Sequence, residues 1–124
     1  MELDALALHW ARRHDRVPLS CPVELRVFPD GPTIRGRTYD ISLAGVGLLS
    51  EAPLEVGTIV CITFLWNHWQ VKTRECVTGH VVSTEADIDG HRLGIEFETV
   101  IGQACQPHLA ATIRELYILF GAGA

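Results

Sequence analysis

The chain has 124 residues, of which 48% are hydrophobic and 20% are charged, and its formal net charge is −5. This length is sufficient for one domain that closes a hydrophobic core without disulfides or metal ions. Ten basic residues are outnumbered by fifteen acidic residues, which argues against the strongly basic surface that binds a nucleic-acid polymer.

The amino-terminal segment has acidic residues early and only a short apolar stretch. It lacks the basic start and the cleavage site of a signal peptide, and no apolar run approaches the roughly 20 residues of a membrane-spanning helix. We therefore expect a cytoplasmic protein without membrane insertion. Leu3, Leu6, Ala7 and Trp10 recur at helical spacing, which predicts an arm or a short helix over residues 1–11.

Positive charge is concentrated directly after this arm. Arg12, Arg13 and Arg16 are accompanied by the single acidic residue Asp15, so this stretch carries a net charge of +2 in an acidic chain. A few well-placed arginines are enough to bind a small anion, because the guanidinium fork matches phosphate oxygens. The composition therefore favours a small anionic ligand over a polymer.

Alternating apolar and polar residues predict six short strands between about residues 20 and 98. Predicted strands cover 21–27, 33–41, 46–50, 58–66, a long stretch from residue 69, and 91–98, with Leu93, Ile95 and Phe97 facing inward. The segments 29–32 (PDGP), 67–68 (Asn-His) and 86–90 (ADIDG) are predicted turns. These elements predict a mostly all-β fold, an antiparallel sheet curled into a barrel.

A helix is predicted after the last strand, over about residues 106–120. Pro107 suits a first helical turn, and the apolar stripe that follows consists of Leu109, Ile113, Leu116, Tyr117 and Phe120. Gly121 is placed to end this helix. We expect the helix to cover an opening or an edge of the barrel.

The stretch YDISLAGVGL, residues 39–48, is the second unusual segment. Asp40 and Ser42 are two residues apart, so they point the same way on an extended chain. Gly45 and Gly47 indicate either a positive φ or a close approach of the backbone to another group. By itself the segment is also typical of a turn between strands with an Asx cap.

Together, the two segments resemble the PilZ domain family. The motif R-x-x-x-R (Arg12, Arg16) is followed after about two dozen residues by D-x-S-x-x-G (Asp40, Ser42, Gly45), and RLGIEF at 92–97 is similar to the last barrel strand of the family. The resemblance covers about residues 10–120. It implies a PilZ domain over residues 12–124, with a six-stranded antiparallel β-barrel, a carboxyl-terminal helix and a flexible amino-terminal arm.

The resemblance also implies a function, the binding of the bacterial second messenger cyclic di-GMP. In this interpretation Arg12, Arg13 and Arg16 hold guanine and phosphate from a loop, while Asp40, Ser42 and Gly45 receive the ligand on the barrel surface. Binding would order and reorient the arm and so signal to an unidentified protein. The expected protein is a monomer or weak dimer that takes one nucleotide per protomer, with no catalytic residue, cofactor or metal.

Three alternatives compete with this interpretation. A PilZ-like adaptor would bind proteins without nucleotide, although the chain keeps both motifs. A metalloenzyme would use some of the four Cys and six His residues, but these are scattered without ligand spacing and are better explained as reduced core thiols and surface imidazoles. A hydrolase using Ser42 or a cysteine lacks a G-x-S-x-G elbow. The chain is interpreted either as a stand-alone receptor or as a regulatory segment of a larger enzyme.

Overall fold

The structure is a computed structural model that describes residues 16–68 and 71–120. The predicted arm over residues 1–11, the predicted ligand residues Arg12 and Arg13, and the predicted helix stop at Gly121 lie outside these ranges.

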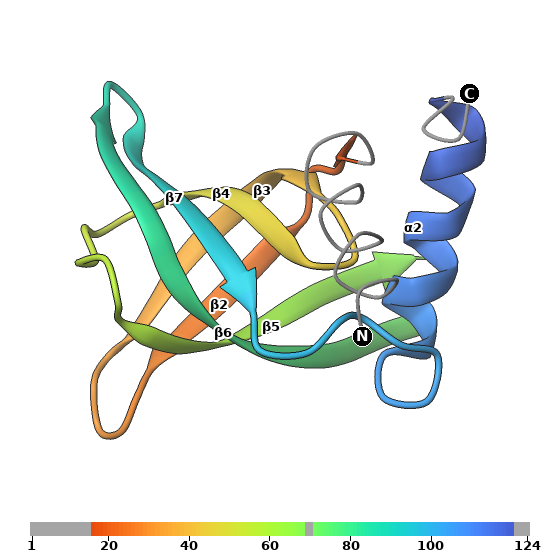
Figure 1. Ribbon diagram of the computed structural model, residues 1–124, viewed down its shortest axis with the longest axis horizontal. Helices are drawn as coiled ribbons and strands as arrows, with labels where there is room; N and C mark the ends of the chain where they lie inside the picture. The colour runs from red at the N-terminus through yellow and green to blue at the C-terminus, as the bar shows by residue number, and fades with distance from the viewer. Residues whose placement is uncertain (1–15, 69–70, 121–124) are drawn as a thin grey trace, which may run out of the picture.

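Seven strands of the described chain form one antiparallel sheet, followed by one helix (Figure 1). The elements are β1 (Val17–Pro18), β2 (Pro22–Val27), β3 (Thr33–Ile41), β4 (Gly45–Ser50), β5 (Ile59–His68), β6 (Val71–Asp87), β7 (Gly90–Phe97) and α2 (Pro107–Leu119). The strand order is β1-β3-β2-β5-β6-β7-β4, and an additional pairing of β3 with β4 closes β2 to β7 into a barrel. The predicted six-stranded antiparallel barrel with a carboxyl-terminal helix is confirmed.

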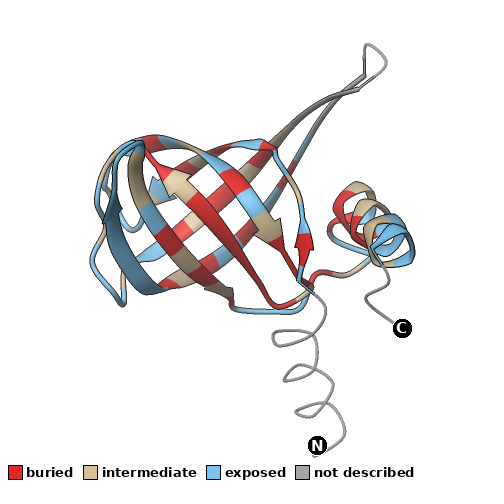
Figure 2. Ribbon diagram, turned by 90° about the horizontal axis from the view of Figure 1, so that it is seen from above, coloured by how far each residue is buried: buried red, intermediate tan, exposed pale blue. Residues whose placement is uncertain are grey.

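Buried residues alternate with more exposed ones along much of the sheet (Figure 2), as expected where every second side chain of a strand points into the barrel and forms its core. Leu93 and Ile95 in β7 are at most 1% exposed and Phe97 is 6% exposed, as their alternation predicted. Val77 and Val81 of β6 are buried on the same principle. The fully buried Phe64 of β5 is among the largest core side chains.

The turn predicted at Asn67-His68 is wrong. Both residues are the last of β5, paired with Lys72 and Val71 of β6. The β5–β6 ladder continues because backbone pairing along two long strands does not require apolar side chains at the strand ends. Strand β5 therefore extends further along the chain than the polar residues indicated.

The predicted apolar stripe of the helix is buried only in part. Leu109 and Ile113 are fully buried and Leu116 and Tyr117 pack against the core at its margin, but Phe120 is 58% exposed. Phe120 is the C-cap residue of α2, and its backbone N–H donates to the carbonyl of Leu116. No helix within residues 16–68 and 71–120 has the length and apolar character needed to cross a membrane.

A carboxylate from the barrel anchors the first turn of α2. Glu75 of β6 is 8% exposed, and its two oxygens accept the backbone N–H groups of His108 at 2.8 Å and Leu109 at 2.7 Å. The helix supplies no side-chain cap of its own at Gln106. The Gln106 amide instead donates to the carbonyl of Cys76 at 3.3 Å and accepts from the N–H of Gly102 at 3.1 Å. A strand therefore provides the acceptors that a helix amino terminus requires.

We expect Glu75→Ala to lower the free energy of unfolding by about 3 kcal/mol, because it leaves two helix N–H groups without their charged acceptor. Urea unfolding followed by circular dichroism measures this change. Glu85→Ala removes an exposed carboxylate from the same strand and is expected to change stability by no more than about 0.5 kcal/mol. Equal effects of the two substitutions would contradict the anchoring role.

Candidate functional site

The two-residue strand β1 places Arg16 beside β3. Val17 pairs with Ile41 and Pro18 pairs with Asp40, and Val17 is buried at 1% exposure. The residue before this strand is Arg16, and its Nη1 lies 2.9 Å from Oδ1 of Asp40. The last arginine of the basic segment and the first residue of the D-x-S-x-x-G motif are thus brought together, although 24 positions separate them.

A bulge in β3 directs Asp40 toward the outer surface. Thr38 pairs with Leu48 and Asp40 pairs with Gly47, which leaves Tyr39 as the extra residue between them. In a regular strand, Tyr39 and Asp40 would point to opposite faces. Because of the bulge both reach the surface, with Tyr39 39% exposed and the Asp40 side chain 29% exposed, while Thr38 remains buried.

Gly47 lies directly against this pair of side chains. Its N–H donates to Oδ1 of Asp40 at 3.1 Å. A Cβ at this position would lie 2.6 Å from the same oxygen and 2.7 Å from the ring of Tyr39. Only a residue without a side chain leaves room for both.

Gly45 is also explained by a close approach. A Cβ at Gly45 would lie 2.6 Å from the carbonyl oxygen of Ile95 and 3.7 Å from Nη2 of Arg16. Among the glycines of the described ranges, a positive φ is found only at Gly57 and Gly90. Of the two explanations that the sequence left open for Gly45 and Gly47, close approach is therefore confirmed.

Ser42 lies in the turn after β3, because that strand ends at Ile41. Its side chain is fully buried. The hydroxyl accepts the N–H of Ala44 at 3.2 Å, and the backbone N–H of Ser42 donates to the carbonyl of Gly45 at 2.8 Å. The serine thus shapes the turn that presents Gly45, and its hydroxyl is not displayed as a surface nucleophile would be. Its contact with a ligand stays a prediction.

The ion pair between Arg16 and Asp40 is partly open to water, with side-chain exposures of 35% and 29%. Pairs with this degree of exposure typically contribute no more than about 1 kcal/mol, because water screens the charges. A ligand that offers an anion to the guanidinium or donors to the carboxylate can therefore open the pair at small cost.

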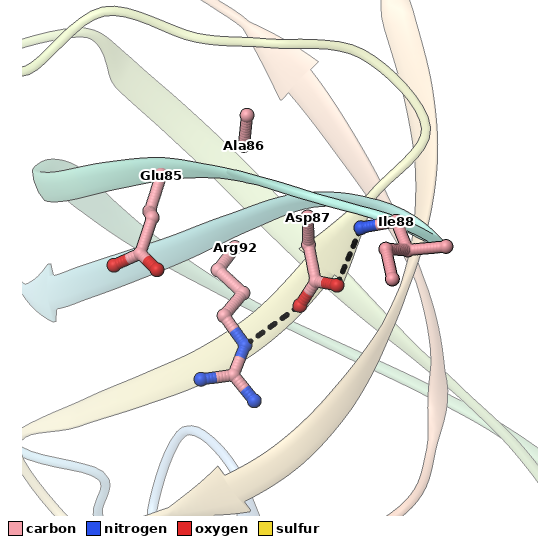
Figure 3. A pocket seen from close by; sticks show the side chains of 5 residues that line it. All are labelled: Glu85, Ala86, Asp87, Ile88 and Arg92. Carbon is pink, nitrogen blue, oxygen red and sulfur yellow. Dashed lines mark hydrogen bonds and ion pairs between the residues drawn. The ribbon is translucent and has the colours of Figure 1, made fainter.

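A hollow of about 540 Å³ at the β6–β7 hairpin is a second place where a ligand could bind (Figure 3). Oδ2 of Asp87 lies 3.0 Å from Nε of Arg92, and Oδ1 of Asp87 accepts the N–H of Ile88 at 2.6 Å. Glu85 and Asp87 both point carboxylates toward this hollow, so it is poorly suited to a doubly charged anion. The Arg16–Asp40 pair is the better candidate site.

Tyr39 and Arg92 lie near the candidate site but were not predicted as site residues from the sequence. The guanidinium of Arg92 lies over the ring of Tyr39, 5.3 Å from the ring centroid. Arg92 belongs to β7 and Tyr39 to β3, so this cation–π contact crosses β4, which pairs with both strands. Neither the bulge nor the proximity of β3 to β7 across β4 leaves a signal in residue order. The only local signal was the position of Tyr39 next to Asp40.

The cysteines are free, and only Cys21 is a buried core thiol as expected. Cys61 is half-buried and Cys76 and Cys105 are exposed, so the interpretation of all four as core residues is wrong. Burial raises the pKa of the Cys21 thiol, which keeps it protonated and unreactive. Within the described part of the chain, no group of three or more His, Cys, Asp or Glu side chains is arranged to hold a metal ion.

Comparison with solved structures identifies the fold. The PilZ domain of YcgR from Escherichia coli, solved with c-di-GMP, matches with a TM-score of 0.63 and 22% identity over 85% of this chain and 90% of that chain. The PilZ domain of CeSA from a cellulose-synthesising bacterium matches with a TM-score of 0.53 and 18% identity over 84% and 96% of the two chains. The inhibitor of motility MotI/DgrA from Bacillus subtilis matches with a TM-score of 0.63 and 15% identity over 81% of this chain. The chain spans about half of MotI, 48% of its length.

No curated protein matches the chain. The family model described as the PilZ domain matches residues 11–114, which includes both sequence motifs and all seven described strands. The chain therefore belongs to the PilZ domain family.

Proposed function

We propose that the chain is a receptor for cyclic di-GMP that binds the nucleotide between its amino-terminal arginine segment and the outer surface of β3 and β4. The observation that carries this proposal is the contact of Arg16 with Asp40, a guanidinium and a carboxylate 2.9 Å apart at the barrel surface. The similarity to the YcgR domain solved with c-di-GMP supports the choice of ligand.

The chemistry of the ligand matches these groups. Cyclic di-GMP carries two phosphodiester charges and two guanines. An arginine fork can bind the O6 and N7 acceptors of guanine or the phosphate oxygens. The Watson–Crick edge of guanine carries N1–H and N2–H₂ donors, for which the carboxylate of Asp40 is a suitable acceptor. On binding, Arg16 exchanges Asp40 for the ligand, and Asp40 exchanges Arg16 for guanine donors.

The predicted roles of Arg12 and Arg13 complete the proposal. Each adds a positive charge within four residues of Arg16, so the nucleotide relieves their mutual repulsion when it binds. The ligand then orders the arginine segment and reorients the arm, which signals to a downstream protein in the cytoplasm. No catalytic step is part of this function. A dissociation constant in the micromolar range, about −8 kcal/mol, is within reach of several charge-assisted hydrogen bonds with stacking.

The alternative is an adaptor that contacts other proteins without nucleotide. The similarity to MotI, a protein named as an inhibitor of motility, is the observation that favours it. In such an adaptor the Arg16–Asp40 pair would be a fixed structural contact. Titration with cyclic di-GMP separates the two functions, because only the receptor gives a saturable signal.

We expect Arg16→Ala and Asp40→Ala each to weaken cyclic di-GMP binding at least tenfold, because each removes one of the two groups that the ligand engages. The free energy of unfolding should change by less than about 1 kcal/mol, since the pair is partly exposed. Isothermal titration calorimetry and thermal unfolding measure the two quantities.

Arg74→Ala is the matched control for charge, because Arg74 is an exposed arginine on β6 with 66% side-chain exposure. This variant is expected to bind the nucleotide as the unsubstituted protein does. Affinity that is unchanged in both site variants, or reduced equally in the control, would contradict the proposed site.

We expect Gly47→Ala to reduce nucleotide affinity while the barrel remains folded. The added Cβ meets the far ends of the Asp40 and Tyr39 side chains, which can rotate away from the site without moving the backbone. Gly102→Ala is the control, because its nearest contact would be an ordinary 3.9 Å. Calorimetry on both variants measures the difference, and equal affinities would show that the position of Asp40 does not matter.

A further inference from the structure

Two of the free cysteines lie next to each other on the outer surface of the barrel. In β5, Val60 and Ile62 are fully buried, so Cys61 between them points outward. In β6, the buried Val77 places its neighbour Cys76 on the outer face in the same way. Cys61 is half-buried, Cys76 is exposed, and a hydrogen bond joins the two thiol groups. The two strands therefore present a pair of neighbouring thiols to the solvent.

The register of the two strands makes these thiols diagonal neighbours. Cys61 pairs directly with Thr78 and Cys76 pairs directly with Thr63, so the two cysteines are offset by two positions. Diagonal neighbours on one face have Cβ atoms about 7 Å apart, whereas a disulfide requires about 3.5–4.5 Å. One ion between the sulfurs suits this spacing better, because two metal–sulfur bonds of about 2.3 Å span up to about 4.6 Å. The ladder thus favours a bridging ion over a direct sulfur–sulfur bond.

Two thiols without further ligands favour a soft ion of low coordination number. Thiolates select Cu(I), Zn²⁺ and iron–sulfur clusters. Structural zinc and iron–sulfur clusters require four protein ligands, and catalytic zinc requires three. Within residues 16–68 and 71–120, no three His, Cys, Asp or Glu side chains are arranged to hold a metal ion. Cu(I) is a soft closed-shell ion that forms stable complexes with two thiolates alone, so it is the ion that this pair suits.

Arg26 of β2 compensates the charge of such a complex. Two thiolates and one Cu(I) carry a net charge of −1, and Arg26 pairs directly with Cys61. Burial raises the pKa of the Cys61 thiol, the neighbouring Cys76 raises it further, and the charge of Arg26 lowers it. Both raising effects oppose a free thiolate, and a cation bound between the sulfurs offsets the repulsion between two thiolates.

The remaining charged or titratable groups beside the thiols already contact each other. These contacts are Glu24 with Arg74 at 3.9 Å and His80 with Glu98 at 3.3 Å. Glu24 is the neighbour of Thr63 on β2, and His80 follows Thr78 on the same face of β6. The carboxylates of this face are thus paired with their own basic partners beside the two sulfurs.

We propose that Cys61 and Cys76 chelate one Cu(I) ion on the outer face of β5 and β6. Binding replaces two sulfur–hydrogen bonds with two copper–sulfur bonds, both protons pass to solvent, and no electron is transferred. The ion joins strands that the ladder already holds in register, so the barrel does not rearrange. The site does not depend on the proposed nucleotide receptor, because none of its residues lies in β1, β3 or β4.

Competition with the chromophoric Cu(I) chelator bathocuproine disulfonate measures this site in the reduced full chain without oxygen. The unsubstituted chain is expected to withdraw one equivalent of Cu(I). Cys61→Ser and Cys76→Ser should each weaken Cu(I) binding at least about tenfold, because each leaves one soft ligand. Cys105→Ser is the matched control, since it removes an exposed free thiol between β7 and α2, and it should keep the full affinity. Retained affinity in either site variant, or an equal loss in the control, would overturn the proposal.

Two further measurements test the geometry. Size-exclusion chromatography of the Cu(I)-loaded chain is expected to give the elution volume of the metal-free chain, and a copper-dependent dimer would overturn chelation within one chain. Mass spectrometry of the folded, metal-free chain after treatment with oxidised glutathione is expected to show no disulfide between Cys61 and Cys76. Such a disulfide would show that the sulfurs can bond directly, which would overturn the argument from diagonal spacing.

The role of Arg26 is tested by separating its charge from its shape. Arg26→Gln is expected to weaken Cu(I) binding severalfold, less than the loss of a thiol, because the complex loses its compensating charge. Arg26→Lys keeps the charge and should restore the affinity. Arg114→Gln, which removes an exposed arginine from α2, is the control and should bind as the unsubstituted chain does. Equal affinities of the Arg26→Gln and Arg26→Lys variants would contradict charge compensation by Arg26.

Discussion

The pairing of β3 with β4 closes the barrel, and the bulge in this pairing determines where the candidate site lies. Closure requires β3 to pair on both edges, with β2 and β4, and also to accept the short β1 beyond the end of β2. The extra residue at Tyr39 lets one strand keep Thr38 inside while Asp40 reaches the surface. Arg16 then meets Asp40 because the buried Val17 fixes the incoming chain on the same strand. The polar contact at the surface is thus a consequence of apolar packing below it.

The helix is held to the barrel by a different type of contact. Burial of Leu109 and Ile113 gives α2 its affinity for the barrel but little directional preference, because apolar contact is not directional. Glu75 supplies direction, since two N–H groups of the first helical turn must face its carboxylate. At the other end, the Tyr117 hydroxyl accepts the N–H of Leu43 at 3.3 Å, in the turn between β3 and β4. The helix therefore contacts both the strand that orients it and the turn that carries the D-x-S-x-x-G motif.

Features that depend on local periodicity were predictable from the sequence, and features that depend on strand pairing were not. The alternation through Leu93, Ile95 and Phe97 identified the inner face of β7, because each strand of a closed barrel has one buried face. The resemblance to the PilZ family implied that Arg16 and Asp40 belong to one site, but the two-residue β1 and the bulge at Tyr39 are set by pairing partners distant in sequence. Glu75 did leave a signal: it is a carboxylate on the same face as Val77, a buried position where a charged residue requires partners.

The contact of Arg16 with Asp40 has a consequence for selectivity. A simple anion that binds Arg16 in place of Asp40 replaces one charge partner by another, and it leaves Asp40 without its guanidinium partner while the Gly47 N–H still donates to it. A molecule that joins an anion to N–H donors can satisfy both released groups at once. In the proposed receptor, Asp40 therefore competes with inorganic phosphate for Arg16, and this competition would favour ligands that combine an anion with N–H donors over ligands that offer charge alone.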